Sequence, residues 1–216
     1  MHAWLFLHIS ELIIANSIVI VNRGIINFIL IFRFDTIEKK VVVIIAVLIR
    51  SLFIQPFYIP SSSMEPTLLV GDRIFVSKLS YGYSKHSFPF SPSIFSGRIL
   101  NKKPNRGDLI VFKTPSDNRT DYIKRLIGNS GDTIQFINGE IYLNEKKILR
   151  EKLNNNFLIR CGSRTFKVNG FKETLPNGIN YTAVYRTEGT MKNTDLYTVP
   201  KGHYFFLGDN RDCSKD

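Results

Sequence analysis

The sequence is poor in the residues that build metal sites and disulfide frameworks. Its only cysteines are Cys161 and Cys213, and its four histidines form no HExxH pattern. Structural zinc sites and zinc-protease centres need such clusters, so we expect no metal and no cofactor. The two cysteines could form one disulfide outside the cytoplasm. Because Cys213 lies in a polar turn beside Ser214, we expect it to be a free thiol instead.

Acidic residues are also scarce relative to basic ones, and the formal net charge is +11. The basic residues are scattered, however, with no basic helix and no RNA-binding signature. Nucleic acid is therefore not an expected partner. At a membrane, an excess of lysine and arginine would favour anionic lipid headgroups, so we expect membrane phospholipids to be partners.

Apolar residues are abundant near the N-terminus. Residues 41–54 are apolar except for Arg50 and Ser51, and they follow a lysine pair and end before Pro56. This pattern predicts a transmembrane helix within a membrane anchor over residues 35–58, with a buried core helix as the alternative. The run is short, because about fifteen helical residues span about 22 Å of a hydrocarbon core of about 30 Å.

The preceding residues are less clear-cut. Residues 12–32 are largely apolar, but Arg23 and three asparagines interrupt them. Residues 1–34 are therefore either a second span or a hydrophobic N-terminal extension. Basic residues at the start of the anchor favour the cytoplasm for that side, which would put residues from 61 onward outside.

Beyond the anchor the sequence predicts a mainly β fold of antiparallel sheets. Alternation over Asp72–Lys78 and short β-rich runs at Leu109–Lys113 and Tyr122–Ile127 indicate strands, and Asn138-Gly139 is a two-residue hairpin signal. No amphipathic helix of ten or more residues follows the anchor. We divide this part into a first catalytic core segment (59–135), an inserted β-rich region (136–199) and a second core segment (200–216).

Five segments of the chain carry recurring polar and apolar patterns. They are Gln55–Pro60, Ser61–Leu68, Gly71–Lys78, Arg106–Asp132 and Gly208–Asp216. In this order they resemble the motifs of type I (leader) signal peptidase, a membrane-anchored Ser-Lys serine protease of bacteria. The resemblance covers roughly residues 50–135 and 200–216. It implies a signal-peptidase-like fold, anchored in the inner (plasma) membrane with its catalytic domain on the periplasmic side.

The resemblance also implies a role for each polar residue of the site. Ser63 matches the nucleophile and Lys124 the general base that takes its proton. Ser61 matches the hydroxyl that stabilises the oxyanion, together with the Ser63 backbone N–H. Ser214 matches the serine that orients the lysine, and Ser62 is a bystander. A Ser-His-Asp triad is the rival arrangement, but the chain has no GxSxG motif.

Lysine can accept a proton only when it is neutral, and its reference pKa is about 10.4. On a strand, Lys124 shares one face with Tyr122 and Leu126, while Arg125 points the other way. We expect burial beside these apolar neighbours to favour the neutral amine.

The implied reaction is endopeptidase cleavage of signal peptides from exported preproteins after small residues. Shallow apolar pockets would select those residues, and an extended substrate would bind as an added strand. The pocket-lining residues that the resemblance implies are Ile59, Pro60, Met64, Leu68, Tyr122 and Ile123. Arg125, Asp209 and Arg211 are expected to be structural charges.

The sequence departs from the family pattern in two places. Cys213 stands where the family has asparagine, and the pattern continues past the aspartate that matches Asp216, where this chain stops. We therefore expect C-terminal truncation. The alternative function is a truncated, inactive relative that binds signal peptides without turnover, and a further one is a membrane-anchored β domain with no Ser-Lys site.

Overall fold

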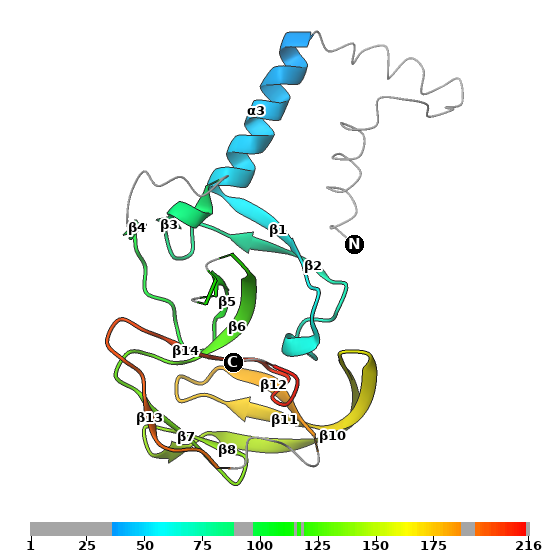
Figure 1. The fold of residues 1–216 in the computed structure, drawn as a ribbon, viewed down its shortest axis with the longest axis vertical. Coiled ribbons are helices and arrows are strands. Elements are labelled where there is room, and N and C mark those ends of the chain that lie inside the picture. Colours follow the sequence, from blue (N-terminus) through cyan, green and yellow to red (C-terminus); the bar gives the residue numbers. More distant parts are fainter. Residues whose placement is uncertain (1–35, 89–96, 115, 118, 187–192, 215–216) are drawn as a thin grey trace, which may run out of the picture. The chain divides into compact units, whose positions relative to one another are not determined.

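The computed structural model confirms a mainly β fold (Figure 1). The chain divides into two units, residues 1–48 and 49–216, and each is described by itself. The residues that the structure describes are 36–88, 97–114, 116–117, 119–186 and 193–214. The expected extension or extra span over residues 1–34 and the expected end of the motif at Asp216 lie outside them.

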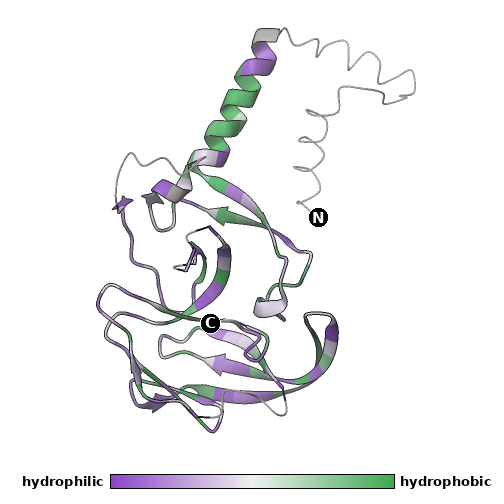
Figure 2. Cartoon of the chain, in the orientation of Figure 1, coloured by the Kyte–Doolittle hydropathy of each residue, from purple (hydrophilic) through white to green (hydrophobic). Residues whose placement is uncertain are grey.

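Helix α3 (Thr36–Leu52) occupies most of the expected anchor. Glu38 in its first turn and Arg50 in its last turn suit the helix dipole. Its middle is hydrophobic after a hydrophilic start (Figure 2), and apolar side chains such as Ile44 and Val47 are exposed. Among the described residues, no helix has both the length and the apolar character needed to cross a membrane.

The helix stops because of a proline. Pro56 cannot continue a helix and drives the residue before it to an extended conformation. The last residues of the expected anchor accordingly form strand β1 (Ile54–Tyr58), which pairs antiparallel with β2 (Arg73–Ser77). Hydrogen bonds from Ile59 N to Asp72 O (2.9 Å) and from Gly71 N to Ile59 O (2.9 Å) extend this ladder by one residue. The segment in between therefore leaves the hairpin as a fixed loop.

A second, three-stranded antiparallel sheet has the order β14-β6-β5. Its strands are β5 (Leu109–Lys113), β6 (Asp121–Gly128) and β14 (Phe205–Leu207). The middle strand, β6, is paired on both edges, so its second half is buried. The pairing of β14 with β6 brings the loop that follows Leu207 to the flank of β6.

A four-stranded sheet has the order β13-β7-β8-β9, and its buried side chains share a core with Ile127 and Leu207 of the preceding sheet. Strands β7 (Thr133–Ile137) and β8 (Glu140–Leu143) form the hairpin that Asn138-Gly139 predicts. Asn138 has φ 51° and Gly139 has φ 75°, as a type I′ turn requires. The outer strands are short: β9 spans Lys146–Lys147 and β13 spans Tyr197–Thr198.

The expected insert contributes long strands, β10 (Leu149–Cys161), β11 (Arg164–Thr174) and β12 (Asn180–Tyr185), which form one antiparallel sheet. The remaining short elements are β3 (Tyr83–Ser84), β4 (Arg98–Ile99) and the 3₁₀ turns η1 (Ser62–Met64) and η2 (Lys85–Ser87). Leu175, Tyr181 and Ala183 from this region join Ile127 and Leu207 in the main hydrophobic core. Residues of the expected insert thus share one core with residues of β6 and β14.

Asp132 closes the turn between β6 and β7 and is a site of pH-dependent stability. Its carboxylate accepts from Arg106 Nη2 at 2.9 Å, Asn144 Nδ2 at 2.8 Å and Asn129 N at 2.5 Å. Partial burial alone would raise the pKa of Asp132, but these hydrogen bonds and the Arg106 charge outweigh it and lower the pKa.

We predict that Asp132→Asn lowers the free energy of unfolding at pH 7 by about 1.5–3 kcal/mol, because a charged hydrogen-bond acceptor is lost. A lowered folded-state pKa stabilises the fold above the unfolded value of about 3.9, and this contribution disappears as the pH falls through the folded value. Urea midpoints of the parent and the variant should therefore converge between pH 5 and about pH 2. Asp195→Asn, at an exposed position, is the control. A difference in urea midpoint between the parent and Asp132→Asn that stays constant with pH would contradict the prediction.

Candidate active site

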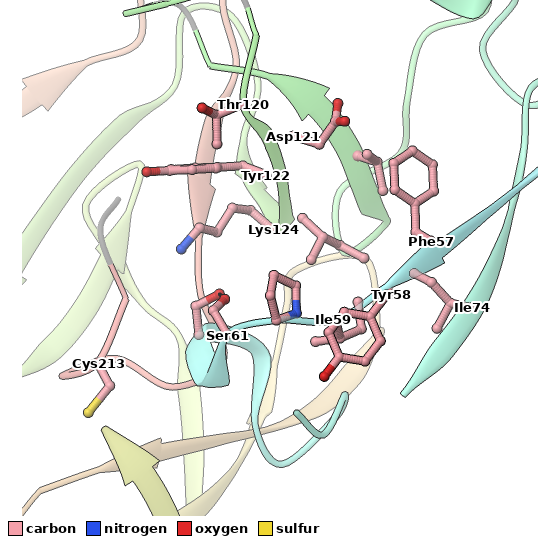
Figure 3. Close-up of a pocket in the computed structure, with 14 residues that line it drawn as sticks. Phe57, Tyr58, Ile59, Ser61, Ile74, Thr120, Asp121, Tyr122, Lys124 and Cys213 are labelled. Atoms are coloured by element: carbon pink, nitrogen blue, oxygen red, sulfur yellow. Dashed lines mark hydrogen bonds between the residues drawn. The ribbon is translucent and has the colours of Figure 1, made fainter. Parts of the chain in front are cut away.

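Turn η1, strand β6 and the loop after β14 meet at a pocket of about 510 Å³. Figure 3 shows its walls, with β1 on one side and β6 on the other. The polar residues that line it include Ser61, Ser63 and Lys124, and Cys213 lies in the same wall. The structure therefore gathers into one pocket side chains from both ends of the described chain, from Phe57 to Cys213.

The serine cluster is shaped by the short turn η1. A hydrogen bond from Glu65 N to Ser62 O (3.0 Å) closes the turn. Ser61 is exposed and its Oγ lies 3.3 Å from Ser63 Oγ, within hydrogen-bonding distance. Ser62 is buried and Met64 is fully buried, and neither lines the pocket. The turn thus presents two of the three hydroxyl groups to the pocket.

Lys124 is buried on β6, with only 3% of its surface exposed. Its Nζ donates a hydrogen bond to Ser214 Oγ and lies 5.7 Å from the centroid of the Tyr122 ring. In the view of Figure 3, the side chain extends between Tyr122 and Ser61. The same-face pairing of Lys124 with Tyr122 is the one expected from strand alternation.

The loop Gly208–Ser214 holds the serine turn by its backbone. Asn210 N donates to Ser63 O at 3.1 Å, and Asn210 Nδ2 donates to Ser62 O at 2.9 Å. Gly208 lies so close to the Ser63 carbonyl and the Ser214 side chain that a Cβ there would collide with both. Gly208 is therefore packed directly between the serine turn and Ser214.

Arg125, the neighbour of Lys124, fastens the start of this loop. Its Nε and Nη2 donate to the two carboxylate oxygens of Asp209 at 2.8 and 2.7 Å, and its Nη1 donates to Gly107 O. Thr67 Oγ1 donates to the same carboxylate. The carboxylate of Asp209 has no exposure to solvent. This bidentate geometry is the strong form of an arginine–carboxylate pair.

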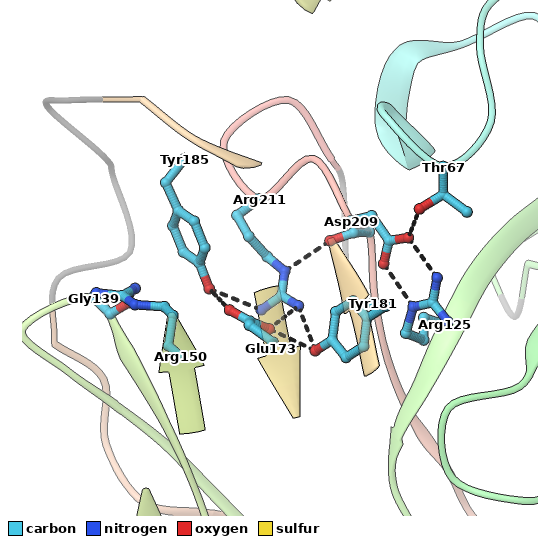
Figure 4. Close-up of polar contacts among 10 residues, drawn as sticks. Thr67, Arg125, Gly139, Arg150, Glu173, Tyr181, Tyr185, Asp209 and Arg211 are labelled. Carbon is cyan, nitrogen blue, oxygen red and sulfur yellow. Dashed lines mark hydrogen bonds and ion pairs between the residues drawn. The ribbon is translucent and has the colours of Figure 1, made fainter. Parts of the chain in front are cut away.

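Arg211 fastens the loop a second time, to the inserted sheet (Figure 4). Its guanidinium donates to Glu173 Oε2 at 2.9 Å, Tyr181 Oη at 2.9 Å and Tyr185 Oη at 3.2 Å, and its Nε donates to Gly208 O. Both tyrosine hydroxyls donate to Glu173. Burial raises the pKa of Tyr181 well above its ordinary value, so this hydroxyl stays a donor.

The residues expected to contact substrate divide into three groups. Ile59, Pro60, Tyr122 and Ile123 line the pocket. Leu68 lines an adjoining groove of about 790 Å³ beside β2 and β5. Met64 lies in the interior below the turn. The expected structural charges Arg125, Asp209 and Arg211 are all buried and ion-paired.

Sequence reasoning missed several residues that hold the site. Asn210 lies within a recognised motif, but no role was predicted for it. It is completely buried, and a buried amide needs a hydrogen-bond partner, which the carbonyl of Ser62 provides. Glu173 and Tyr181 lie in the insert, where no local pattern marks them. Among the described residues, no cluster of histidine, cysteine or acidic side chains could hold a metal ion.

The expectation that Cys213 is a free thiol is wrong, because it forms a disulfide with Cys161. The end of β10 runs beside the Gly208–Ser214 loop and brings the two Cα atoms to 5.6 Å, a normal separation for a disulfide. The sequence does not reveal this proximity because 52 positions separate the two residues.

Comparisons with known proteins cover the same segments. A family model described as signal peptidase, peptidase S26, matches residues 35–216. Signal peptidase I of Rickettsia conorii is 47% identical over 185 residues, which cover 81% of this chain and 68% of that protein. Signal peptidase I of Rickettsia rickettsii gives the same identity and coverage, and that of Rickettsia prowazekii is 45% identical over 184 residues with the same coverage.

We predict that Glu173→Ala lowers the free energy of unfolding by about 3–5 kcal/mol, because it leaves the buried Arg211 charge unpaired. Glu173→Gln, which retains hydrogen-bonding atoms, should cost less. Lys147→Ala is the matched control: it breaks an exposed ion pair with Glu140 (2.7 Å) and should cost less than about 1 kcal/mol. Urea unfolding measures all three, and equal losses for Glu173→Ala and Lys147→Ala would contradict the prediction.

Proposed function

The chain belongs to the signal peptidase family of S26 peptidases, and we propose that it is a membrane-bound serine endopeptidase that cleaves signal peptides from exported preproteins. The observation that carries this proposal is the joint position of Ser63 and Lys124 in one pocket, with the lysine amine on Ser214. Ser63 is the nucleophile and Lys124 is the general base.

The reaction begins when Ser63 Oγ attacks the scissile carbonyl carbon and its proton passes to the Lys124 amine. The Ser61 hydroxyl and the Ser63 backbone N–H stabilise the oxyanion of the tetrahedral intermediate. Lys124 then protonates the leaving amine, which releases the mature protein and leaves an acyl-enzyme. Water, deprotonated by Lys124, hydrolyses the ester and frees the signal peptide.

Ser214 acts on the base rather than on the substrate. Its Oγ accepts a hydrogen bond from Lys124 Nζ, which fixes the direction of the amine. The ring of Tyr122 covers the amine from the other side. A base that is held in place needs no reorganisation at the moment of proton transfer, which is the value of a preorganised site.

The shape of the pocket supports an extended substrate that ends in small residues. Strand β1 continues into Ile59 and Pro60 on one wall, and Tyr122 and Ile123 of β6 form the facing wall. A peptide strand can add between these segments through its backbone, and the apolar side chains Ile59, Ile123 and Val111 line the pocket that would receive its side chains. Steric exclusion by such walls selects small residues before the cut.

The apolar surface of α3 supports a membrane location. Val43, Ile44 and Val47 are about half exposed, and a contiguous exposed apolar surface marks an interaction site. The lysines at its start suit anionic headgroups. The disulfide supports an oxidising compartment for the catalytic part, which fits the outer face of the membrane.

We predict that Ser63→Ala and Lys124→Ala each abolish cleavage of a preprotein, while Ser62→Ala retains it within about threefold, because Ser62 does not line the pocket. Release of the mature protein, followed by gel electrophoresis, is the measurement, and circular dichroism confirms folding. Near-full turnover by Lys124→Ala would reject the Ser-Lys reading. A folded parent that binds the preprotein without cleaving it would favour the inactive relative.

We predict that the protein stays with membranes after a high-salt wash and is released by detergent. Introducing Lys at both Ile44 and Val47 should release it with salt, because each charge opposes apolar burial by about 2.5–3.5 kcal/mol. Leu158→Lys, at an equally apolar exposed position on β10, is the control and should leave the distribution unchanged. Release of the parent by salt alone would contradict the membrane location.

A further inference from the structure

One cysteine of a disulfide lines the candidate active-site pocket. Cys213 lines the pocket together with Ser61, Ser63 and Lys124, and it directly precedes Ser214 in the chain. Its partner Cys161 is the last residue of β10. The disulfide therefore joins the end of β10 to Cys213. The next residue, Ser214, accepts the hydrogen bond from the Lys124 amine.

The end of β10, residues 159–161, also supports the nucleophile. Arg160 N donates to Glu65 Oε2 at 3.0 Å, and Glu65 is the buried residue that closes turn η1. Ile159 is 2% exposed and belongs to a small apolar cluster that includes Cys213. One strand end thus contacts both halves of the catalytic apparatus, the serine turn and the loop that ends in Ser214.

The Cys161–Cys213 disulfide lies where the Gly208–Ser214 loop leaves the protein interior. Asp209, Asn210 and Arg211 are buried, whereas Cys213 and Ser214 are partly exposed. Backbone contacts continue outward, since Asp212 accepts from Arg186 N at 2.7 Å and Cys213 N donates to Asn210 O at 3.3 Å. A covalent bond at Cys213 fixes the next residue without adding a polar group to the pocket.

We propose that the Cys161–Cys213 disulfide is a positioning element of the catalytic site, which holds Ser214 and through it Lys124, so that turnover depends on the oxidised state of the pair. The inference rests on the proposed function. It adds that Cys161, which is absent from the pocket lining, controls the catalytic rate from outside.

Reduction proceeds by ordinary thiol–disulfide exchange. A dithiol such as dithiothreitol attacks one sulfur as its thiolate, forms a mixed disulfide and closes to its own cyclic disulfide. Two electrons and two protons then reside on Cys161 and Cys213 as thiols. Ser214 gains freedom, and the lysine amine spends less time aligned with Ser63. The bond joins neither β1 nor β6, which carry the residues proposed to contact substrate, so we expect substrate affinity to change little.

The experiment compares the oxidised and the reduced enzyme on one signal-peptide substrate. We expect reduction to lower kcat by about tenfold to hundredfold, the cost of a small misplacement of a catalytic group, and to change KM by less than about twofold. Mass spectrometry after thiol alkylation verifies that the bond is open. Reoxidation should restore kcat.

Cys161→Ser is the key variant because it removes the disulfide without changing the pocket lining. It should show the kcat of the reduced parent and no response to dithiothreitol. Ser214→Ala should lower kcat in the oxidised parent but add little in the Cys161→Ser background, since both act on the same lysine. Additive losses in this double-mutant cycle would overturn the positioning role.

Protease resistance and circular dichroism, recorded with each rate, keep the test decisive. Reduced enzyme that stays folded and cleaves at the parent rate overturns the inference, and so does a loss of rate that follows unfolding. Should Cys161→Ser fail to fold, the reduced and reoxidised parent still gives the answer. Absence of cleavage in both redox states rejects the proposed function as well, whereas cleavage that ignores reduction rejects this inference alone.

Discussion

The arrangement of the site depends on two buried ion pairs that fix one loop, Arg125–Asp209 and Arg211–Glu173. Buried charges are tolerated only when they are paired and hydrogen-bonded, so neither pair can open without a large cost. Between them lies Asn210, whose backbone and side chain hold the turn that carries Ser63. The loop is therefore a rigid platform between the serine turn and the lysine strand.

Strand β6 carries the proposed base and a supporting arginine on alternate sides. Lys124 faces the pocket, and Arg125, one residue later, faces the interior and binds Asp209. Lys124 and Arg125 are adjacent on one strand. The Arg125–Asp209 ion pair, which fixes the loop, therefore also fixes the backbone that carries the Lys124 amine. The proposed base and its proposed orienter, Ser214, are thus located by a common constraint.

Much of this could be predicted from the sequence. Local alternation gave the strands around Lys124, and Asn138-Gly139 gave its hairpin, because both features depend on neighbouring residues only. Residues from several of the motifs that resemble signal peptidase, among them Ser61, Ser63 and Lys124, lie around one pocket. The partner of Arg211 could not be predicted, because Glu173 lies in a segment with no recognisable pattern. The disulfide was the less favoured alternative to a free thiol, because pairing at long range is a property of the tertiary fold and not of local sequence.

The contacts that hold the site connect residues far apart in the chain. Lys124 and Ser214 are 90 positions apart, Arg125 and Asp209 are 84, and Asn210 and Ser62 are 148. Contacts of such long range form late and make folding slow. During synthesis, a chain that has emerged only as far as Lys124 possesses both the hydroxyl and the amine but lacks Ser214, Asp209 and Asn210, which hold them in place. The proposed protease therefore stays inactive until its C-terminal loop has been made.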